Sequence, residues 1–399
     1  MNDQKKSVEY AKQAINYVFA KKTDIDYGKV KGLSELITIM RKNNVPENQF
    51  WVYVAEYYER KAREKGIPLN GLLELTPLCN LDCKMCYVHL NHNQLQGKKI
   101  LSVEQWKRII TQAHALGMMN VTLSGGECLT YPGFDEIYMF LRDMGIQPGI
   151  KTNGVLLNDE RISFFQKYKP KSINVSLYGS SNETYEKVTG YRIFDVVFDN
   201  LQKLKNAELP VSLSITPSIH MFDDMANIFA LVRQLGFSSS LNISLFQPRE
   251  ETGRELQDLS SKHYVEIYKI ARSEEESWKI SLQEDDLPEC GLTGEPLFGI
   301  RCGAGRSSFN VRWDGYLTSC DNLRSLKVNL LNKSFSEAWD LVHEDAISYP
   351  LPVECTNCAY DKVCFNCVSF RENGAEKGHC KPEVCKRTRL FVKEGIYKL

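Results

Sequence analysis

Three cysteines stand close together in the segment LTPLCNLDCKMCYVHLN, at Cys79, Cys83 and Cys86. Thiolates at such short spacing are typical ligands of zinc or of an iron–sulfur cluster. A closed structural zinc site needs four ligands. No fourth cysteine follows nearby, although His89 and His92 lie just downstream. An iron–sulfur cluster on three protein thiolates leaves one iron free for another ligand. The spacing alone leaves both metals open.

The elements that must position these thiols are short apolar runs, which alternate with amphipathic helices from Leu72 onward. The strand-like runs cover residues 72–76, 120–124, 148–152, 172–177, 211–216 and 241–246. The first helical pattern, 101–117, begins with the capping pair Ser102 and Gln105 and ends at Gly117. Six β–α alternations predict a parallel sheet that is closed or partly closed as a barrel.

Polar and glycine residues follow the strand-like runs at the edge where such sheets bind ligands. The second run leads into Gly125, Gly126 and Glu127, where the two glycines leave backbone free to approach a ligand and the glutamate offers an acceptor. The third run ends at Asn153, and the fourth presents Ser176. Each signal is weak alone, but together they predict a site on the same rim as the three cysteines.

The remaining cysteines predict a separate C-terminal metal-binding domain. The chain has 13 cysteines, with one at Cys128, none between Cys128 and Cys290, and nine after that gap. In a reducing compartment such a number favours metal or redox use over disulfides. Zinc ribbons are the alternative here. The nine are Cys290, Cys302, Cys320, Cys355, Cys358, Cys364, Cys367, Cys380 and Cys385, and they include two C-x2-C pairs.

Composition and the N-terminal segment narrow the class of protein. In 399 residues, Lys plus Arg equals Asp plus Glu at 50 each, so no overall charge attracts nucleic acid or an acidic membrane. The first residues, MNDQKKSVEY, lack the apolar core of a signal peptide. We expect a cytoplasmic protein. Residues 1–70 read as helical, and FWVYVAEYYERK within them is a candidate face for a leader peptide, with packing against the barrel as the alternative.

The C-x3-C-x2-C motif after the first strand, followed by Gly-Gly-Glu after the second, resembles the radical S-adenosylmethionine (radical SAM) superfamily. The resemblance implies a partial (β/α)6 TIM-like barrel with a [4Fe–4S] cluster on Cys79, Cys83 and Cys86. S-adenosylmethionine would chelate the open iron, and electron transfer would then yield a 5′-deoxyadenosyl radical that abstracts hydrogen from the substrate. The implied electron source is a low-potential donor such as flavodoxin or ferredoxin.

The same resemblance implies which residues contact S-adenosylmethionine. Gly125, Gly126 and Glu127 would contact its methionine amino group, and Asn153 and Ser176 its carboxylate or ribose. The residue before the third cysteine is usually aromatic in this superfamily, whereas this chain has Met85 there and Tyr87 after it. Met85 can still pack softly against adenine. Cys128 stands where proline is common and is a packing residue or a hydrogen-atom donor.

The C-terminal cysteines resemble the SPASM domain of peptide-modifying radical enzymes, with one interval shortened to C-x2-C. The resemblance implies two auxiliary clusters with interleaved ligands. Cys380 would then be left over. The implied ligands are Cys290, Cys302, Cys320 and Cys367 for auxiliary cluster I, and Cys355, Cys358, Cys364 and Cys385 for auxiliary cluster II.

These resemblances imply four parts: a helical extension (1–70), a radical SAM barrel (71–248), a helical bridge (249–289) and a SPASM domain (290–399). They imply an oxidoreductase that installs a thioether or carbon–carbon crosslink in a ribosomally made precursor peptide. The first alternative is a sulfatase-maturating enzyme that forms formylglycine, and the second is a peptide epimerase. A zinc-stapled binding protein without catalysis is the alternative from another class.

Overall fold

The computed structural model divides the chain into two compact units, Met1–Ile67 and Pro68–Leu399. The first 24 residues of the predicted helical extension (1–70) and the predicted ligand Cys290 lie outside the described residues. The structure describes residues 25, 27, 30–243, 245–255, 257–273, 299–323, 325–352, 355, 358–361, 363–364, 367–372 and 375–397.

The first unit contains a pair of helices, as its apolar periodicity predicts. Helix α2 (Leu33–Lys42) is followed by a 3-10 turn, η2 (Glu47–Gln49), and by α3 (Phe50–Lys65). A small core of its own includes Leu36 and Met40 from α2 and the inward face of α3. Helix α3 ends at Gly66, whose left-handed backbone closes the last turn.

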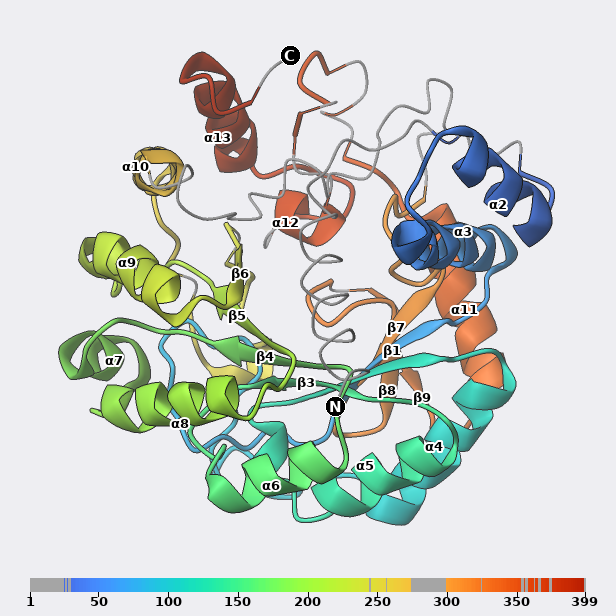
Figure 1. Ribbon diagram of the computed structural model, residues 1–399, viewed down its shortest axis with the longest axis horizontal. Coiled ribbons are helices and arrows are strands. Elements are labelled where there is room, and N and C mark those ends of the chain that lie inside the picture. The colour runs from blue at the N-terminus through green and yellow to red at the C-terminus, as the bar shows by residue number, and fades with distance from the viewer. Residues whose placement is uncertain are drawn as a thin grey trace. The chain divides into compact units, whose positions relative to one another are not determined.

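The second unit is built on one open sheet of nine strands, in the order β6-β5-β4-β3-β2-β1-β7-β8-β9 (Figure 1). Strands β1 to β6 pair in parallel, which confirms the predicted parallel sheet in its partly closed form. The strands are β1 (Asn70–Glu74), β2 (Asn120–Ser124), β3 (Gly149–Thr152), β4 (Ser172–Ser176), β5 (Val211–Ile215), β6 (Ser238–Leu241), β7 (Ser308–Val311), β8 (Tyr316–Thr318) and β9 (Val328–Asn329).

Helices cover the outer face of the parallel strands (Figure 1). Helix α4 begins with the predicted capping box, in which Ser102 and Gln105 each accept a backbone N–H from the other. The barrel helices are α4 (Val103–Ala115), α5 (Phe134–Asp143), α6 (Asp159–Lys167), α7 (Asn182–Thr189), α8 (Phe194–Asn206) and α9 (Met225–Leu235). The later helices are α10 (Ser261–Ser273), α11 (Phe335–Ser348), α12 (Val368–Glu372) and α13 (Pro382–Lys393).

The last parallel strand lies earlier than its apolar pattern predicts. The alternation in 241–246 is real, since Leu241, Ile243 and Leu245 are all buried. However, β6 forms its ladder with β5 through the serine-rich Ser238–Leu241. An edge strand has a partner on one side only, so its buried residues can continue the alternation beyond the point where pairing stops.

The sheet continues from the barrel into the cysteine-rich region. Strand β7 pairs in parallel with β1, with Asn70 opposite Ser308, and β8 and β9 extend the sheet in antiparallel fashion. Helix α10 packs on α13 through Tyr268 and Phe391, whose ring centres lie 5.1 Å apart. The C-terminal region is therefore joined to the barrel by main-chain hydrogen bonds and by a helix pair.

Within the described part of the chain, no helix has the length and apolar character needed to cross a bilayer.

Candidate active site

The loop after β1 and the Gly-Gly-Glu turn after β2 cross in direct contact. Gly126 N donates to Thr76 O at 2.7 Å, and Glu127 N donates to Leu78 O at 2.9 Å. A Cβ on Gly126 would lie 2.4 Å from Leu78 O, and one on Gly125 would lie 2.4 Å from Thr76 O. The glycines are thus required where two main chains meet, and this crossing sets the path of the loop that carries the three cysteines.

The carboxylate of Glu127 joins the end of β2 to the end of β3. It is buried and accepts hydrogen bonds from Thr152 Oγ1 at 3.0 Å, Asn153 N at 2.7 Å and Leu129 N at 3.1 Å. Burial raises the pKa of Glu127, while these donors act in the opposite direction. The side chain therefore braces the rim, and its main chain is also engaged, because Glu127 O accepts a hydrogen bond from Thr130 Oγ1 at 2.7 Å.

Asn153 connects the third strand end to the cysteine loop. Its side-chain nitrogen donates to Asn80 Oδ1 at 2.7 Å and lies 3.6 Å from Cys79 Sγ, while its oxygen accepts Val155 N at 3.0 Å. Ser176, at the end of β4, hydrogen-bonds the phenol of Tyr178. The structure therefore brings both predicted residues to the rim. Asn153 lies against the cysteine loop, and Ser176 reaches it through Tyr178.

The three thiols of the first motif gather at the C-terminal edge of the barrel. Burial raises the pKa of Cys79 to about 12, and the nearby Glu127 and Cys86 act in the same direction. The backbone N–H of Leu81 lowers this pKa. Burial and the neighbouring Cys86 and Cys79 raise the pKa of Cys83 well above its usual range. The negative charges of neighbouring thiolates repel one another, and a bound cation compensates them.

Hydrogen-bond donors surround these sulfur atoms. Leu81 N lies 3.4 Å from Cys79 Sγ, His89 N lies 3.3 Å from Cys86 Sγ, and the phenol of Tyr178 donates to Cys83. Donors to sulfur are a feature of iron–sulfur sites, where they stabilise the reduced cluster. In the described ranges, no three His, Cys, Asp or Glu side chains already stand in coordination geometry. The fit to a cluster therefore rests on the set of donors and their surroundings.

Of the two histidines that left a zinc site open, His89 is engaged by other charged side chains. Nδ1 of His89 lies 3.3 Å from both Asp82 Oδ1 and an Arg254 nitrogen, and burial and then Arg254 lower its pKa. Arg254 also donates to Cys83 O and pairs with Asp82, so it clamps the cysteine loop. His92 is exposed and lines a cavity of about 490 Å³ beside Cys79.

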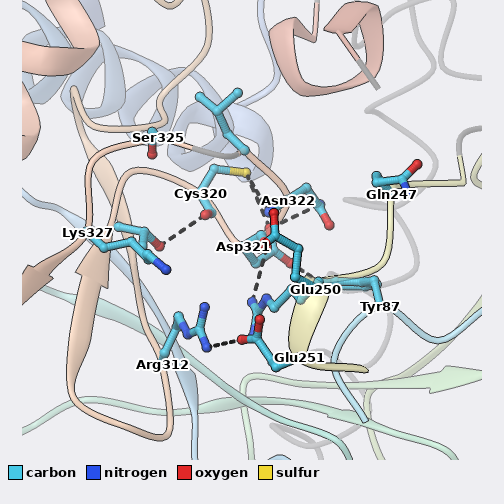
Figure 2. A pocket seen from close by; sticks show the side chains of 13 residues that line it. Tyr87, Gln247, Glu250, Glu251, Arg312, Cys320, Asp321, Asn322, Ser325 and Lys327 are labelled. Carbon is cyan, nitrogen blue, oxygen red and sulfur yellow. Dashed lines mark hydrogen bonds and ion pairs between the residues drawn. The ribbon is translucent and has the colours of Figure 1, made fainter. Parts of the chain in front are cut away.

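A second cavity, of about 210 Å³, lies between the barrel rim and the C-terminal region (Figure 2). Tyr87, next to Cys86, lines it and donates its hydroxyl to Asp321 Oδ2 at 2.8 Å. Asp321 follows Cys320, which lines the same cleft. Tyr87 thus links the first cysteine loop to a C-terminal cysteine, while the neighbouring Met85 packs partly against the barrel core.

A buried ion pair supports the floor of this cleft. Both terminal nitrogens of Arg249 donate to the carboxylate of Glu74, at 2.8 and 2.6 Å. Arg249 also donates to the main-chain oxygen of Asp321 at 3.1 Å. The side-chain nitrogen of Asn310 donates to the carboxylate of Glu74 at 3.1 Å. Arg312 and Glu251 form a further pair on the lining (Figure 2). The residues after β6, the end of β1 and the loop of Cys320 are therefore fixed together.

The C-terminal thiols form two groups. In the first, Cys302, Cys320 and Cys367 lie close enough for their charges to affect one another, and burial raises the pKa of Cys367 to about 12. In the second, Cys355 and Cys385 lie near Cys364, whose pKa burial raises. The last cysteine of the C-x2-C-x5-C-x2-C run thus lies with Cys302 and Cys320, and the ligand sets themselves stay a prediction.

The second group also contains a cysteine that the predicted ligand set leaves over. Cys380 Sγ lies 3.9 Å from Cys385 Sγ and interacts with Cys355. The guanidinium of Arg371, 1% exposed and paired with Asp361, faces Cys364 and Cys355.

Cys358 and Cys128 have different surroundings. The main chain of Cys358 forms a turn with Cys355, at 3.2 Å from N to O. The thiol of Cys128 is fully buried and donates to Lys151 O at 3.2 Å, which is the environment of a packing residue.

Comparison with known proteins identifies the barrel. Residues 73–232 match the family model described as the Radical SAM superfamily. These residues are a radical SAM domain. The cofactors of this superfamily are S-adenosylmethionine and a [4Fe–4S] cluster. Three neighbouring thiols, which leave one iron open to another ligand, suit that cluster.

Relatives and solved structures extend the likeness beyond this domain. The chain is 25% identical over 261 residues to the sporulation killing factor maturation protein SkfB of Bacillus subtilis (strain 168), covering 64% of this chain and 60% of SkfB. Streptococcus suis SuiB bound to precursor peptide SuiA aligns with a TM-score of 0.64 at 15% identity, covering 96% of this chain and 88% of SuiB. The structure titled native anSMEcpe with bound AdoMet aligns at 0.66 and 18% identity, covering 82% and 97%. At these identities the two structures support the fold alone.

Sequence reasoning missed the residues that hold the loops in place. Tyr178, Arg254, Arg249 and Arg371 stand far from the cysteine motifs in the chain, and single tyrosines or arginines carry no spacing signal.

Proposed function

We propose that this protein is a radical SAM enzyme with a C-terminal SPASM domain that crosslinks a ribosomally made peptide. The observation that carries the proposal is the placement of three groups of neighbouring cysteine thiols. One lies at the barrel rim, and two lie in the region that continues the same sheet. The cysteine loop and the Cys320 loop meet at one cleft through the bond from Tyr87 to Asp321, so a substrate held there would lie near both.

In this proposal, Cys79, Cys83 and Cys86 hold the [4Fe–4S] cluster at the rim. The cluster and S-adenosylmethionine supply, when bound, the 5′-deoxyadenosyl radical that removes hydrogen from the substrate. Asn153 positions the loop through Asn80, and Arg254 fixes the backbone of Cys83. The proposed contacts to S-adenosylmethionine come from the residues that the sequence predicts for this role, which are Met85, Tyr87, Gly125, Gly126, Glu127, Asn153 and Ser176.

The C-terminal region is proposed to hold two auxiliary clusters. Cys290, Cys302, Cys320 and Cys367 are the proposed ligands of auxiliary cluster I. Mutual proximity of Cys302, Cys320 and Cys367 supports this assignment. Cys355, Cys358, Cys364 and Cys385 are the proposed ligands of auxiliary cluster II. Closing a crosslink after hydrogen removal releases one electron, and clusters in this region offer an acceptor for it.

The peptide substrate is inferred from the relatives and from the cleft. The name of SkfB describes maturation of a killing factor, and SuiB was solved with its precursor peptide SuiA. The cleft beside Tyr87 is lined by both charges, with Arg312 and Lys327 opposite Glu250 and Glu251. Such a lining can hold the polar main chain of a peptide.

We also propose two further partners. The first is a low-potential electron donor such as flavodoxin or ferredoxin. The second is a leader peptide bound by α3, where Trp51 and Tyr58 are more than half exposed.

The alternatives receive less support. The likeness to anSMEcpe supports the fold alone, whereas the sequence relative SkfB is named for maturation of a killing factor. Peptide epimerisation needs a hydrogen donor near the substrate, and the fully buried Cys128 is poorly placed for this role.

The test is to incubate a candidate precursor peptide, encoded next to this protein's gene, with anaerobically reconstituted and reduced enzyme and S-adenosylmethionine. The proposal expects 5′-deoxyadenosine and a peptide lighter by two hydrogen atoms for each crosslink. The variant Cys83→Ala serves as the control and should yield neither product. A peptide of unchanged mass that incorporates solvent deuterium would instead indicate epimerisation, and conversion of Cys or Ser to formylglycine would indicate sulfatase maturation.

A further inference from the structure

The second thiol group has one more cysteine than a four-iron cluster needs. Cys355, Cys364, Cys380 and Cys385 belong to one cluster of packed side chains, and Cys358 is joined to Cys355 by a backbone turn. Cys367 also packs against this cluster, but its thiol interacts with Cys302 of the first group. A cubane cluster in which a thiolate binds every iron takes four thiolates. The fifth thiol, Cys380, is buried and lies 3.9 Å from Cys385 Sγ, so either sulfur can reach a common iron with a small movement.

The two neighbouring thiols are held by the same rigid segment. Lys381 N donates to Arg371 O at 2.8 Å, which fixes the chain just after Cys380. Pro382 then begins α13, and Cys385 stands in its first turn. One turn later, Thr388 Oγ1 lies 3.4 Å from Cys364 Sγ, so α13 is anchored against the thiol group. Cys380 and Cys385 are thus presented side by side from one helix start.

We propose that Cys380 is an alternative ligand of auxiliary cluster II and can take the place of Cys385. This inference rests on the proposed function, because it assumes a cluster at the second thiol group. In the exchange, Cys380 gives up its proton and bonds to iron while Cys385 leaves the iron and takes up a proton. No electron is transferred. The guanidinium of Arg371 faces Cys364 and Cys355, which are ligands in both arrangements.

The first C-terminal group supplies a matched control. Its described thiols are Cys302, Cys320 and Cys367, and with Cys290 from the sequence they make four, with no spare. Loss of one thiol there should therefore reduce the iron bound at auxiliary cluster I. Loss of Cys385 alone should leave auxiliary cluster II in place.

The experiment measures iron and sulfide in the anaerobically reconstituted full chain, together with the EPR spectrum of the reduced protein. Wild type should hold about twelve iron atoms, as expected for three cubane clusters. We expect Cys380→Ala and Cys385→Ala each to keep about twelve, with an altered EPR signal in Cys385→Ala. The double variant and the control Cys320→Ala each leave one iron of an auxiliary cluster without a thiolate, and each should fall below twelve, to about eight where the whole cluster is lost.

A single variant of Cys380 or Cys385 that falls to about eight iron atoms would overturn the exchange, as would a double variant that keeps about twelve. Formation of 5′-deoxyadenosine by the same samples shows whether the barrel remains folded and loaded, because that reaction depends on the first three cysteines. Either overturning result leaves the proposed function intact if wild type holds about twelve iron atoms. Wild type that binds zinc and no iron would instead overturn the proposed function itself.

Discussion

The ion pair between Glu74 and Arg249 gives a prediction whose size follows from its geometry. The guanidinium meets the carboxylate through two hydrogen bonds, and the two side chains are only 2% and 12% exposed. Removing one partner of such a pair leaves the other charge buried without compensation, which costs about 3–5 kcal/mol. We therefore expect Glu74→Gln to lower the free energy of unfolding of the second unit by about that amount.

This loss can be measured as a shift in melting temperature. For a unit of about 330 residues, the entropy of unfolding is about 0.7 kcal/mol per kelvin, so Tm should fall by about 4–7 °C. The assay is thermal melting of reconstituted protein, followed by circular dichroism under anaerobic conditions at one scan rate. The double variant Glu74→Gln/Arg249→Met should recover part of the loss, because it removes both charges.

The exposed pair of Glu183 and Arg192 is the matched control. Its side chains are 63% and 51% exposed, so Glu183→Gln should leave Tm almost unchanged. The reasoning is refuted if Glu74→Gln shifts Tm no more than this control does, or if the double variant loses the sum of the two single losses.

Three further predictions concern the rim. Gly126→Ala would place a Cβ 2.4 Å from Leu78 O, so the cysteine loop must move and the iron content should fall by about four atoms. The control Gly32→Ala, which has open space around its Cβ, should retain all of its iron. Equal iron content in the two variants would contradict the close contact between Gly126 and the cysteine loop. Tyr87→Phe removes the 2.8 Å bond to Asp321, a bond to a charged group worth about 1.5–3 kcal/mol, and Tm should fall accordingly; an unchanged Tm would show that the link does not hold the cleft. Cys128→Ala removes a fully buried thiol from the packing and should leave the yield of 5′-deoxyadenosine and of peptide product unchanged; loss of product with normal 5′-deoxyadenosine would restore Cys128 as a hydrogen donor.

The sequence was informative about the barrel because its strands and caps are local signals. The apolar runs at 120–124 and 172–177 lie within a residue of β2 and β4, and Ser102 with Gln105 forms the predicted box. Strand β6 was placed too late because burial alternates beyond the paired residues. Pairing of β7 with β1 joins segments more than 200 residues apart, and neither segment carries a signal for the other.

The candidate site divides in the same way. Short cysteine spacings predict which thiols gather, and the structure brings Cys79, Cys83 and Cys86 to one rim. The supporting contacts depend on the folded arrangement. Arg254 reaches Cys83 O from 171 residues away, and Tyr87 reaches Asp321 from 234 residues away. Cys380 was left over because the motif counts one final cysteine, whereas proximity to Cys385 appears only in the folded chain.

The central claim is that the first three cysteines hold a cluster with one iron open to S-adenosylmethionine. The most direct measurement is EPR of the reduced, anaerobically reconstituted protein before and after addition of S-adenosylmethionine, compared with the variant Cys79→Ala/Cys83→Ala/Cys86→Ala. The account predicts that S-adenosylmethionine changes one cubane signal in wild type, and that the variant lacks this signal. A wild-type spectrum that S-adenosylmethionine does not change, or a variant that keeps the responsive signal, would contradict it.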